Sequence, residues 1–290
     1  MIVLEVVFLV LFWTWVLSAG LFLRNTFLPR LPVTITPATL QLPFEGVAFH
    51  ATDGLKLAGW KIPGDPARPW VILCHGLGTN RADMLDIAAG LHGTGLNLFL
   101  FDFRAHGESQ GNATSFGWHE QRDLEGALVY LGQQPDVPDR PYGILGISMG
   151  GSVAIMVASG DERLGAVAID SSYTNLERSI GLHLKLLYHL PKHPFLLFAG
   201  SAYRMRFGVW PNRMAPIDQI GRISPRPVLL IQSQDDPRIP VEDTQAMFER
   251  AKEPKELWIV PGMEHLGAYQ HDPSVYINRL AGFFTSHLTP

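Results

Sequence analysis

Short apolar runs alternate with amphipathic segments along most of this chain, from about residue 45 to its end. Six continuous apolar runs predict strands at residues 71–75, 96–103, 142–147, 166–170, 228–233 and 256–260. The segments between and after them predict helices at about 82–93, 119–134, 149–159, 241–251 and 274–287. Continuous apolar strands are typical of strands buried on both faces. Their alternation with helices predicts an α/β fold, a mostly parallel, doubly wound sheet covered on both faces.

Two further strand-like runs precede this alternation, at residues 47–50 and 55–62. They are separated by Thr52-Asp53-Gly54. Asp-Gly between alternating apolar residues is a strong hairpin signal, because glycine accepts the left-handed backbone that a tight turn needs. The sequence therefore predicts a β-hairpin at the start of the folded domain, which we place at residues 44–290.

A long interruption separates the fourth and fifth of the six apolar strands. It runs from Ser171 to Pro227, which is too long for a simple connection in a compact domain, and its content is helical and apolar. Ligands bind at the carboxyl edge of open α/β sheets, so helices inserted here predict a lid over that edge, at about residues 171–225. The alternative interpretation is extra packing on the core.

The N-terminus has a different composition from the rest. Residues 6–23 form a run of about 18 residues without a charge, the minimum length for a helix that spans a bilayer. We expect an uncleaved membrane anchor over residues 1–24. The alternatives are a signal peptide cleaved near Ser18-Ala19-Gly20 and a buried core helix. Glu5 and the absence of Lys or Arg before the run argue against a signal peptide.

Residues 25–43 contain four prolines and little periodicity, which predicts an extended linker between the anchor and the folded domain. Arg24 and Arg30 follow the apolar run, and nothing basic precedes it. Because cytoplasmic flanks of membrane helices are enriched in Lys and Arg, we expect a single-pass protein whose folded domain faces the cytoplasm.

Composition excludes several classes of function. Hydrophobic residues make up 47% of the 290 residues and charged residues 17%, so a large core can form. The net charge is -4 without a basic run, which argues against a nucleic-acid partner. Cys74 is the only cysteine, so an internal disulfide and a cysteine-based metal cluster are excluded. We expect neither a metal nor an organic cofactor. The sequence leaves the oligomeric state open.

The first candidate for chemistry is Ser148, in Gly146-Ile147-Ser148-Met149-Gly150. It lies where a predicted strand ends and a helix with small residues begins. A serine on such a turn is lifted above the sheet edge as an exposed nucleophile, and glycines on either side relieve the crowding. The helix N-terminus behind it offers free N–H groups to an oxyanion.

An acyl-transfer site also needs two N–H donors for the tetrahedral oxyanion. In folds with this serine turn, one donor is the residue after the nucleophile, here Met149, and the other lies in a loop after an early strand. His75-Gly76-Leu77-Gly78 directly follows the strand at residues 71–75, so we assign the second N–H to Leu77. His75 is expected to brace this loop structurally.

An acid and a base follow the serine in the order that a triad requires. Asp235 and Asp236 follow the strand at residues 228–233, and either carboxylate could hold a histidine. His265 lies on the loop after the last strand, where a mobile imidazole can reach Ser148. His271 and His287 are later histidines, but neither follows a strand directly.

Five stretches together resemble the α/β-hydrolase superfamily, in its bacterial serine aminopeptidase-like or monoglyceride-lipase-like type. They are His75 to Arg81, Asp102 to Ser109, Gly146 to Gly151, Asp236 with Pro240, and Gly262 to His265. The resemblance implies the α/β-hydrolase fold and a triad of Ser148, Asp236 and His265, since the family's Asp-x-x-[Val/Ile]-Pro spacing selects the second aspartate. It also implies that residues 102–109 form a structural loop. Ala105 and Glu264 stand where the family frequently has glycine.

The sequence thus predicts a serine hydrolase that works through an acyl-enzyme. Because the expected lid is short, apolar and close to an anchor, carboxylic esters with apolar acyl groups are the favoured substrates. A peptidase or amidase of the serine aminopeptidase type is one alternative. A catalytically silent binding protein of the same fold is another, because a fold alone does not prove activity.

Overall fold

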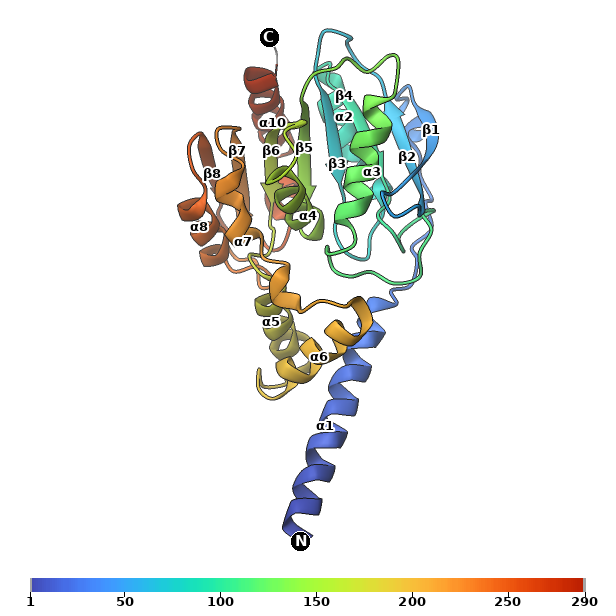
Figure 1. The fold of residues 1–290 in the computed structure, drawn as a ribbon. Helices are drawn as coiled ribbons and strands as arrows, with labels where there is room; N and C mark the ends of the chain where they lie inside the picture. Colours follow the sequence, from blue (N-terminus) through green and yellow to red (C-terminus); the bar gives the residue numbers. More distant parts are fainter. Residues whose placement is uncertain (1, 289–290) are drawn as a thin grey trace.

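The computed structural model describes residues 2–288, and a mixed sheet forms its centre (Figure 1). Within these residues the sheet has eight strands in the order β1-β2-β4-β3-β5-β6-β7-β8. The first hairpin and the β2–β4 pair are antiparallel, and the other five pairs are parallel. The strands are β1 (Glu45–His50), β2 (Lys56–Ile62), β3 (Trp70–Cys74), β4 (Asn97–Phe101), β5 (Tyr142–Ile147), β6 (Leu164–Asp170), β7 (Val228–Ser233) and β8 (Lys255–Val260).

Helices cover both faces of this sheet. The main ones are α2 (Leu85–Gly93), α3 (Gln121–Gly132), α4 (Met149–Ala158), α8 (Val241–Arg250), α9 (Gly267–His271) and α10 (Pro273–Leu288). Five of these six helices were predicted, with ends that differ by a few residues. The short helix α9 was not, because five residues are too few to show a helical period. The expected doubly wound α/β-hydrolase fold is confirmed.

The core consists of two layers, one on each face of the sheet, because successive strand residues point to opposite faces. In β3, Ile72 packs in the layer that includes residues of α3 and α4, such as Leu124 and Val153. Its neighbours Val71 and Leu73 pack in the layer of α2 and α10. Both layers contain fully buried side chains, so β3 is apolar throughout.

The predicted hairpin is present at residues 51–55. The Ala51 N–H donates to the Leu55 carbonyl, and Gly54 has a φ of +86°. A side chain is strained at such a φ, so glycine is the residue that this turn favours.

Residues 171–227 contain the helices of the expected lid. They are α5 (Leu176–Tyr188), α6 (Phe195–Phe207), α7 (Pro216–Gln219) and the single turns at Pro211–Arg213 and Ile220–Arg222. In Figure 1, α5 and α6 lie apart from the sheet, below the ends of its strands. Leu176 and His183 of α5 face the same cavity as Ser148, so this segment, called the lid below, covers the edge that carries the nucleophile.

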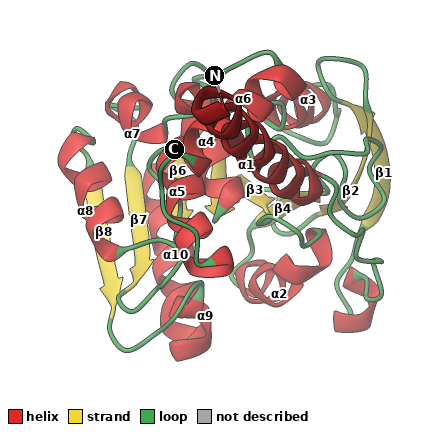
Figure 2. Cartoon of the chain, turned by 90° about the horizontal axis from the view of Figure 1, so that it is seen from below, coloured by secondary structure: helices red, strands yellow, loops and turns green. Residues whose placement is uncertain are grey.

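The N-terminal run forms one long helix, α1 (Ile2–Thr26), which is long and apolar enough to cross a membrane. Its N-terminal half projects away from the rest of the chain, with α5 and α6 beside its other half (Figure 1). Viewed from below, α1 crosses the molecule with α6 next to it (Figure 2). Ser18, Ala19, Phe22 and Thr26 are buried, so part of α1 packs as a core helix does.

The expected linker is not free of the domain. Residues 28–36 have no regular structure, and a single 3-10 turn follows at Pro37–Leu40. The Arg30 guanidinium donates to the carbonyls of Gly107, Ser109 and Gly111, and Asn80 donates to the Leu31 carbonyl. The segment is therefore held along the domain surface at several points. The domain boundaries at residues 24 and 43 stay predictions.

Candidate active site

Ser148 lies on a strained turn between β5 and α4. Its φ of +50° and ψ of -117° are unusual for a residue with a side chain. A Cβ on Gly146 would lie 2.5 Å from the Gly150 carbonyl oxygen, and one on Gly150 would lie 2.4 Å from the Cys74 carbonyl oxygen. Glycine is required at both positions because backbone atoms pack there. The glycines of the motif thus relieve the crowding around Ser148, as the sequence indicated.

The structure brings His265 and Asp236 to Ser148. The His265 Nε2 lies 3.2 Å from the Ser148 Oγ, and the His265 Nδ1 lies 2.6 Å from the Asp236 Oδ2. Since an ionised carboxylate only accepts hydrogen bonds, Nδ1 carries the proton and Nε2 is free to accept one from the serine hydroxyl. This chain of hydrogen bonds has the geometry of a nucleophile, base and acid.

Asp236, rather than Asp235, occupies the acid position. Its side chain is buried, and its second oxygen accepts the N–H groups of Arg238 and Ile239 at 2.8 and 2.9 Å. Asp235 is exposed, and its N–H bonds the Met263 carbonyl. His265 therefore faces a carboxylate that the following loop holds in place.

The two expected oxyanion donors meet at the same cavity. Leu77 and Met149 both line it, beside Ser148. Met149 is the first residue of α4, so its N–H has no acceptor within that helix. Within residues 2–288 the Leu77 N–H has no protein acceptor either. Both amides are available to an oxygen bound next to the serine.

His106 holds the loop that carries Leu77, a role that the sequence did not single out. Its Nε2 accepts the Gly78 N–H at 3.1 Å, and its Nδ1 donates to the Arg104 carbonyl at 2.8 Å. Burial lowers the pKa of His106, which keeps Nε2 unprotonated and able to accept. The motif Asp102 to Ser109 was the available signal, since this loop follows the neighbouring strand.

His75 braces the same region, as expected, and does not reach the serine. Its Nε2 accepts the Phe103 N–H at 3.0 Å, and its Nδ1 bonds the Gly76 carbonyl at 2.7 Å. Complete burial, with a smaller contribution from nearby His106, lowers its pKa from 6.5 to about 3. His75 is thus a neutral link between the loops after β3 and β4.

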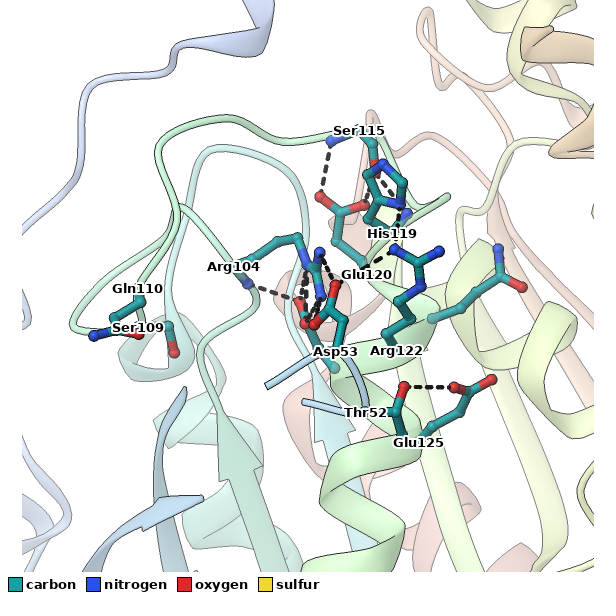
Figure 3. Close-up of polar contacts among 12 residues, drawn as sticks. Thr52, Asp53, Arg104, Ser109, Gln110, Ser115, His119, Glu120, Arg122 and Glu125 are labelled. Atoms are coloured by element: carbon teal, nitrogen blue, oxygen red, sulfur yellow. Dashed lines mark hydrogen bonds and ion pairs between the residues drawn. The ribbon is translucent and has the colours of Figure 1, made fainter. Parts of the chain in front are cut away.

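The loop after β4 is held by buried ion pairs (Figure 3). Arg104 donates to Asp123 through Nε and Nη2, and to Asp53 of the hairpin through Nη1 and Nη2. Asp102 is fully buried and accepts the Glu108 N–H. These bonds are structural and lie apart from the serine, as the family resemblance implied.

Ala105 and Glu264, which depart from the family pattern, differ in backbone conformation. Ala105 has a φ of +63°, in the left-handed region that favours glycine. Glu264 is exposed and does not have a positive φ, so a side chain fits there without strain.

A buried carboxylate shapes the rim of the cavity through residues 114–117. Figure 3 shows Glu120 pointing at Ser115. Glu120 accepts the Ser115 and Gly117 N–H groups, both at 2.9 Å, and the hydroxyls of Thr114 and Ser115. These bonds hold Phe116, a cavity-lining residue with a φ of +57°. No sequence motif marks Glu120, because its partners are mostly backbone groups of an irregular loop.

The resulting cavity has a volume of about 560 Å³ and contains both Ser148 and His265. Apolar side chains provide most of its wall, including Phe116, Leu176 and Ile239. His183 of the lid also lines it.

Comparison with known proteins agrees with this fold. YqkD of Bacillus subtilis is 29% identical over 238 residues, which cover 81% of this chain and 77% of that protein. YfhR of Escherichia coli (strain K12) is 29% identical over 257 residues, which cover 85% of this chain and 82% of that protein. Among solved structures, the esterase Pf2001 of Pyrococcus furiosus is 28% identical with a TM-score of 0.74, covering 91% of this chain and 100% of that one.

A family model supplies the assignment. The model described as the alpha/beta hydrolase family matches residues 71–279, which is most of the chain. The match begins in β3 and ends in α10, and so includes the turn at Ser148 and the loops that hold Asp236 and His265. The chain therefore belongs to the alpha/beta hydrolase family.

Proposed function

We propose that this protein is a serine hydrolase that cleaves carboxylic esters through an acyl-enzyme. One observation carries the proposal: the continuous hydrogen bonds from Asp236 through His265 to the Ser148 hydroxyl, at the wall of an apolar cavity. The resemblance to Pf2001, which is named an esterase, supports the choice of esters.

In the proposed reaction the Ser148 Oγ attacks the ester carbonyl carbon, and its proton passes to the His265 Nε2. The carbonyl oxygen becomes an oxyanion that accepts the Leu77 and Met149 N–H groups. Collapse breaks the bond to the alcohol, which leaves with the proton from His265. Water then loses a proton to His265, attacks the acyl-enzyme and releases the acid and the free serine.

The nucleophile is tested by labelling the full-length protein with a fluorophosphonate probe. We expect the wild type to react and Ser148→Ala to lose the label completely. Labelling that persists in Ser148→Ala would contradict the assignment. A folded wild type that does not react would support a silent binding protein instead.

The substrate class is tested with p-nitrophenyl esters beside aminoacyl amides. We expect ester hydrolysis to dominate, because the cavity wall is largely apolar and would bury an acyl chain. Hydrolysis of amides alone would overturn the ester assignment and favour a peptidase of the serine aminopeptidase type.

We also propose that α1 is a single-pass anchor and that the catalytic domain faces the cytoplasm. The 25-residue length of α1, its apolar composition and the arginines that follow its apolar run support this orientation. A topology reporter fused to the C-terminus tests it. We expect the activity pattern of a cytoplasmic reporter, and an extracytoplasmic signal would contradict the orientation.

A further inference from the structure

A second cavity, of about 170 Å³, lies between α1 and the lid helix α5. Leu21 and Phe22 of α1 form one wall, and Ile180 and Leu184 of α5 form the other. Half of the other ten lining residues are apolar as well. We call it the anchor-side cavity, and its chemistry suits a hydrocarbon chain.

The anchor-side cavity adjoins the cavity that contains Ser148. Leu77, Phe116, Leu176, Ser179 and His183 line both. Phe116 and Leu77 of the oxyanion loop thus border both spaces. An acyl chain that extends from an ester carbonyl at Ser148 toward α1 would cross this shared border into the anchor-side cavity.

Specific contacts fix α1 as a wall of the anchor-side cavity. The Trp15 Nε1 donates to the Ser201 Oγ at 2.9 Å, and the Asn25 Nδ2 donates to the Tyr188 hydroxyl at 2.7 Å. The Phe22 ring packs on the Tyr203 ring with centroids 5.7 Å apart. These contacts join α1 to α5 and α6, and their loss would open the cavity wall. A signal peptide cleaved near Ser18-Ala19-Gly20 would remove Trp15 and its contact with Ser201.

The length of the part of α1 that does not pack on other helices determines how deep the lid lies relative to a bilayer. Residues 2–13 are exposed, and at about 1.5 Å per residue they extend roughly 18 Å. A bilayer core is about 30 Å thick, so a spanning α1 must also immerse the part that packs on the lid. Leu197 of α6 is 59% exposed and Met205 is 74% exposed, as expected for side chains in lipid. The opening beside α1 then faces acyl chains rather than water.

We propose that the anchor-side cavity receives the acyl chain of a long-chain ester resident in the membrane, which enters from the bilayer between α1 and α5. This inference rests on the proposed esterase function and adds its substrate class. The chain lies along Leu21 and Leu184, and the ester carbonyl reaches Ser148. The anchor helix is thereby a part of the substrate-binding site as well as an attachment.

The test uses the full-length protein in phosphatidylcholine vesicles and two probes, p-nitrophenyl palmitate and p-nitrophenyl acetate. The variant Leu21→Trp fills the cavity, and Leu17→Trp is the matched control. Leu17 is on the same helix, is 51% exposed and does not line the cavity. We expect Leu21→Trp to lower the ratio of kcat/KM for palmitate to kcat/KM for acetate about tenfold or more. A loss of this size corresponds to roughly two methylene groups of the palmitoyl chain that are no longer buried. The control should keep the wild-type ratio.

The outcomes separate the two proposals. If the wild type cleaves neither probe and does not react with a fluorophosphonate, the esterase function itself is wrong. If it cleaves acetate but the ratio is equal in wild type and Leu21→Trp, the esterase stands and the cavity proposal is overturned. An intact mass that shows cleavage of the membrane-bound protein near Ser18-Ala19-Gly20 would also overturn the cavity proposal, because the contacts that fix α1 as a wall would be lost.

Discussion

Two adjacent aspartates, Asp235 and Asp236, allow the clearest test of a single residue. Asp236→Asn keeps the size of the side chain but offers His265 a neutral amide, so the imidazole can take the wrong tautomer. We expect kcat to fall about 10⁴-fold, the loss typical of this change in a serine triad. Asp235→Asn should stay close to wild type, because Asp235 is exposed and has no contact with His265. Equal losses in both variants, measured on p-nitrophenyl acetate, would argue against Asp236 as the acid.

The lowered pKa of His75 predicts how the free energy of unfolding depends on pH. Its pKa is about 3 in the folded protein and 6.5 in the unfolded chain, so the unfolded chain binds the proton more tightly. The stabilising contribution is complete above pH 6.5 and is lost as the pH falls toward 3. At pH 5 the loss is about 2 kcal/mol, at 1.36 kcal/mol per pKa unit.

Urea unfolding in detergent micelles at pH 7 and pH 5 measures this contribution. The fall in unfolding free energy between the two pH values should be about 2 kcal/mol smaller in His75→Gln than in the wild type. Identical falls would show that His75 does not titrate in this way.

At the scale of elements, one carboxylate on the turn before α3 holds the rim of the cavity. Glu120→Ala leaves two N–H groups and two hydroxyls without their acceptor, so we expect a loss of about 3 kcal/mol in unfolding free energy. KM for p-nitrophenyl esters should rise as Phe116 loses its support. Glu125→Ala is the control, because Glu125 makes one solvent-exposed bond to Thr52. Similar effects of both changes on KM would contradict the role of Glu120.

The sheet elements were predictable from the sequence for a physical reason. Strands buried on both faces are apolar throughout, so each appears as an uninterrupted run, and β5 was predicted residue for residue. Ser148 and Asp236 follow such runs, which placed them at one sheet edge before any contact was known. The loop at residues 114–117 shows neither the alternation of a strand nor the period of a helix. Its position at the site could therefore not be predicted.

The packing of α1 was equally hidden. Its apolar residues lie all around the helix, so no polar face distinguishes the side that packs on protein from the exposed side. The interpretation of α1 as purely an anchor was therefore incomplete: Ser18 and Phe22 are buried against other helices. Only the tertiary structure brings Trp15 and Ser201 together.

For the whole molecule, the depth of the lid is measurable with one label. Cys74 is completely buried, and burial raises the pKa of its thiol well above the usual range, so an introduced cysteine can be labelled selectively. An environment-sensitive dye on Met205→Cys should show blue-shifted emission in vesicles, because Met205 lies on the lid. Val275 lies on α10 and is 49% exposed. The same dye on Val275→Cys should show the unshifted emission that is typical of water. Equal emission at both sites would place the lid outside the bilayer.

The contact between Trp15 and Ser201 has a consequence for biosynthesis. The two residues are 186 positions apart, and translation at about 5–20 residues per second separates their appearance by roughly 10–40 s. During that interval the anchor helix is already made, while the helix that it packs against is not. The packing of α1 on α6 therefore forms only after more than half of the chain has been translated. His265 is translated later still, so the hydrogen bonds among Ser148, Asp236 and His265 can form only after α1 and α6 are both made.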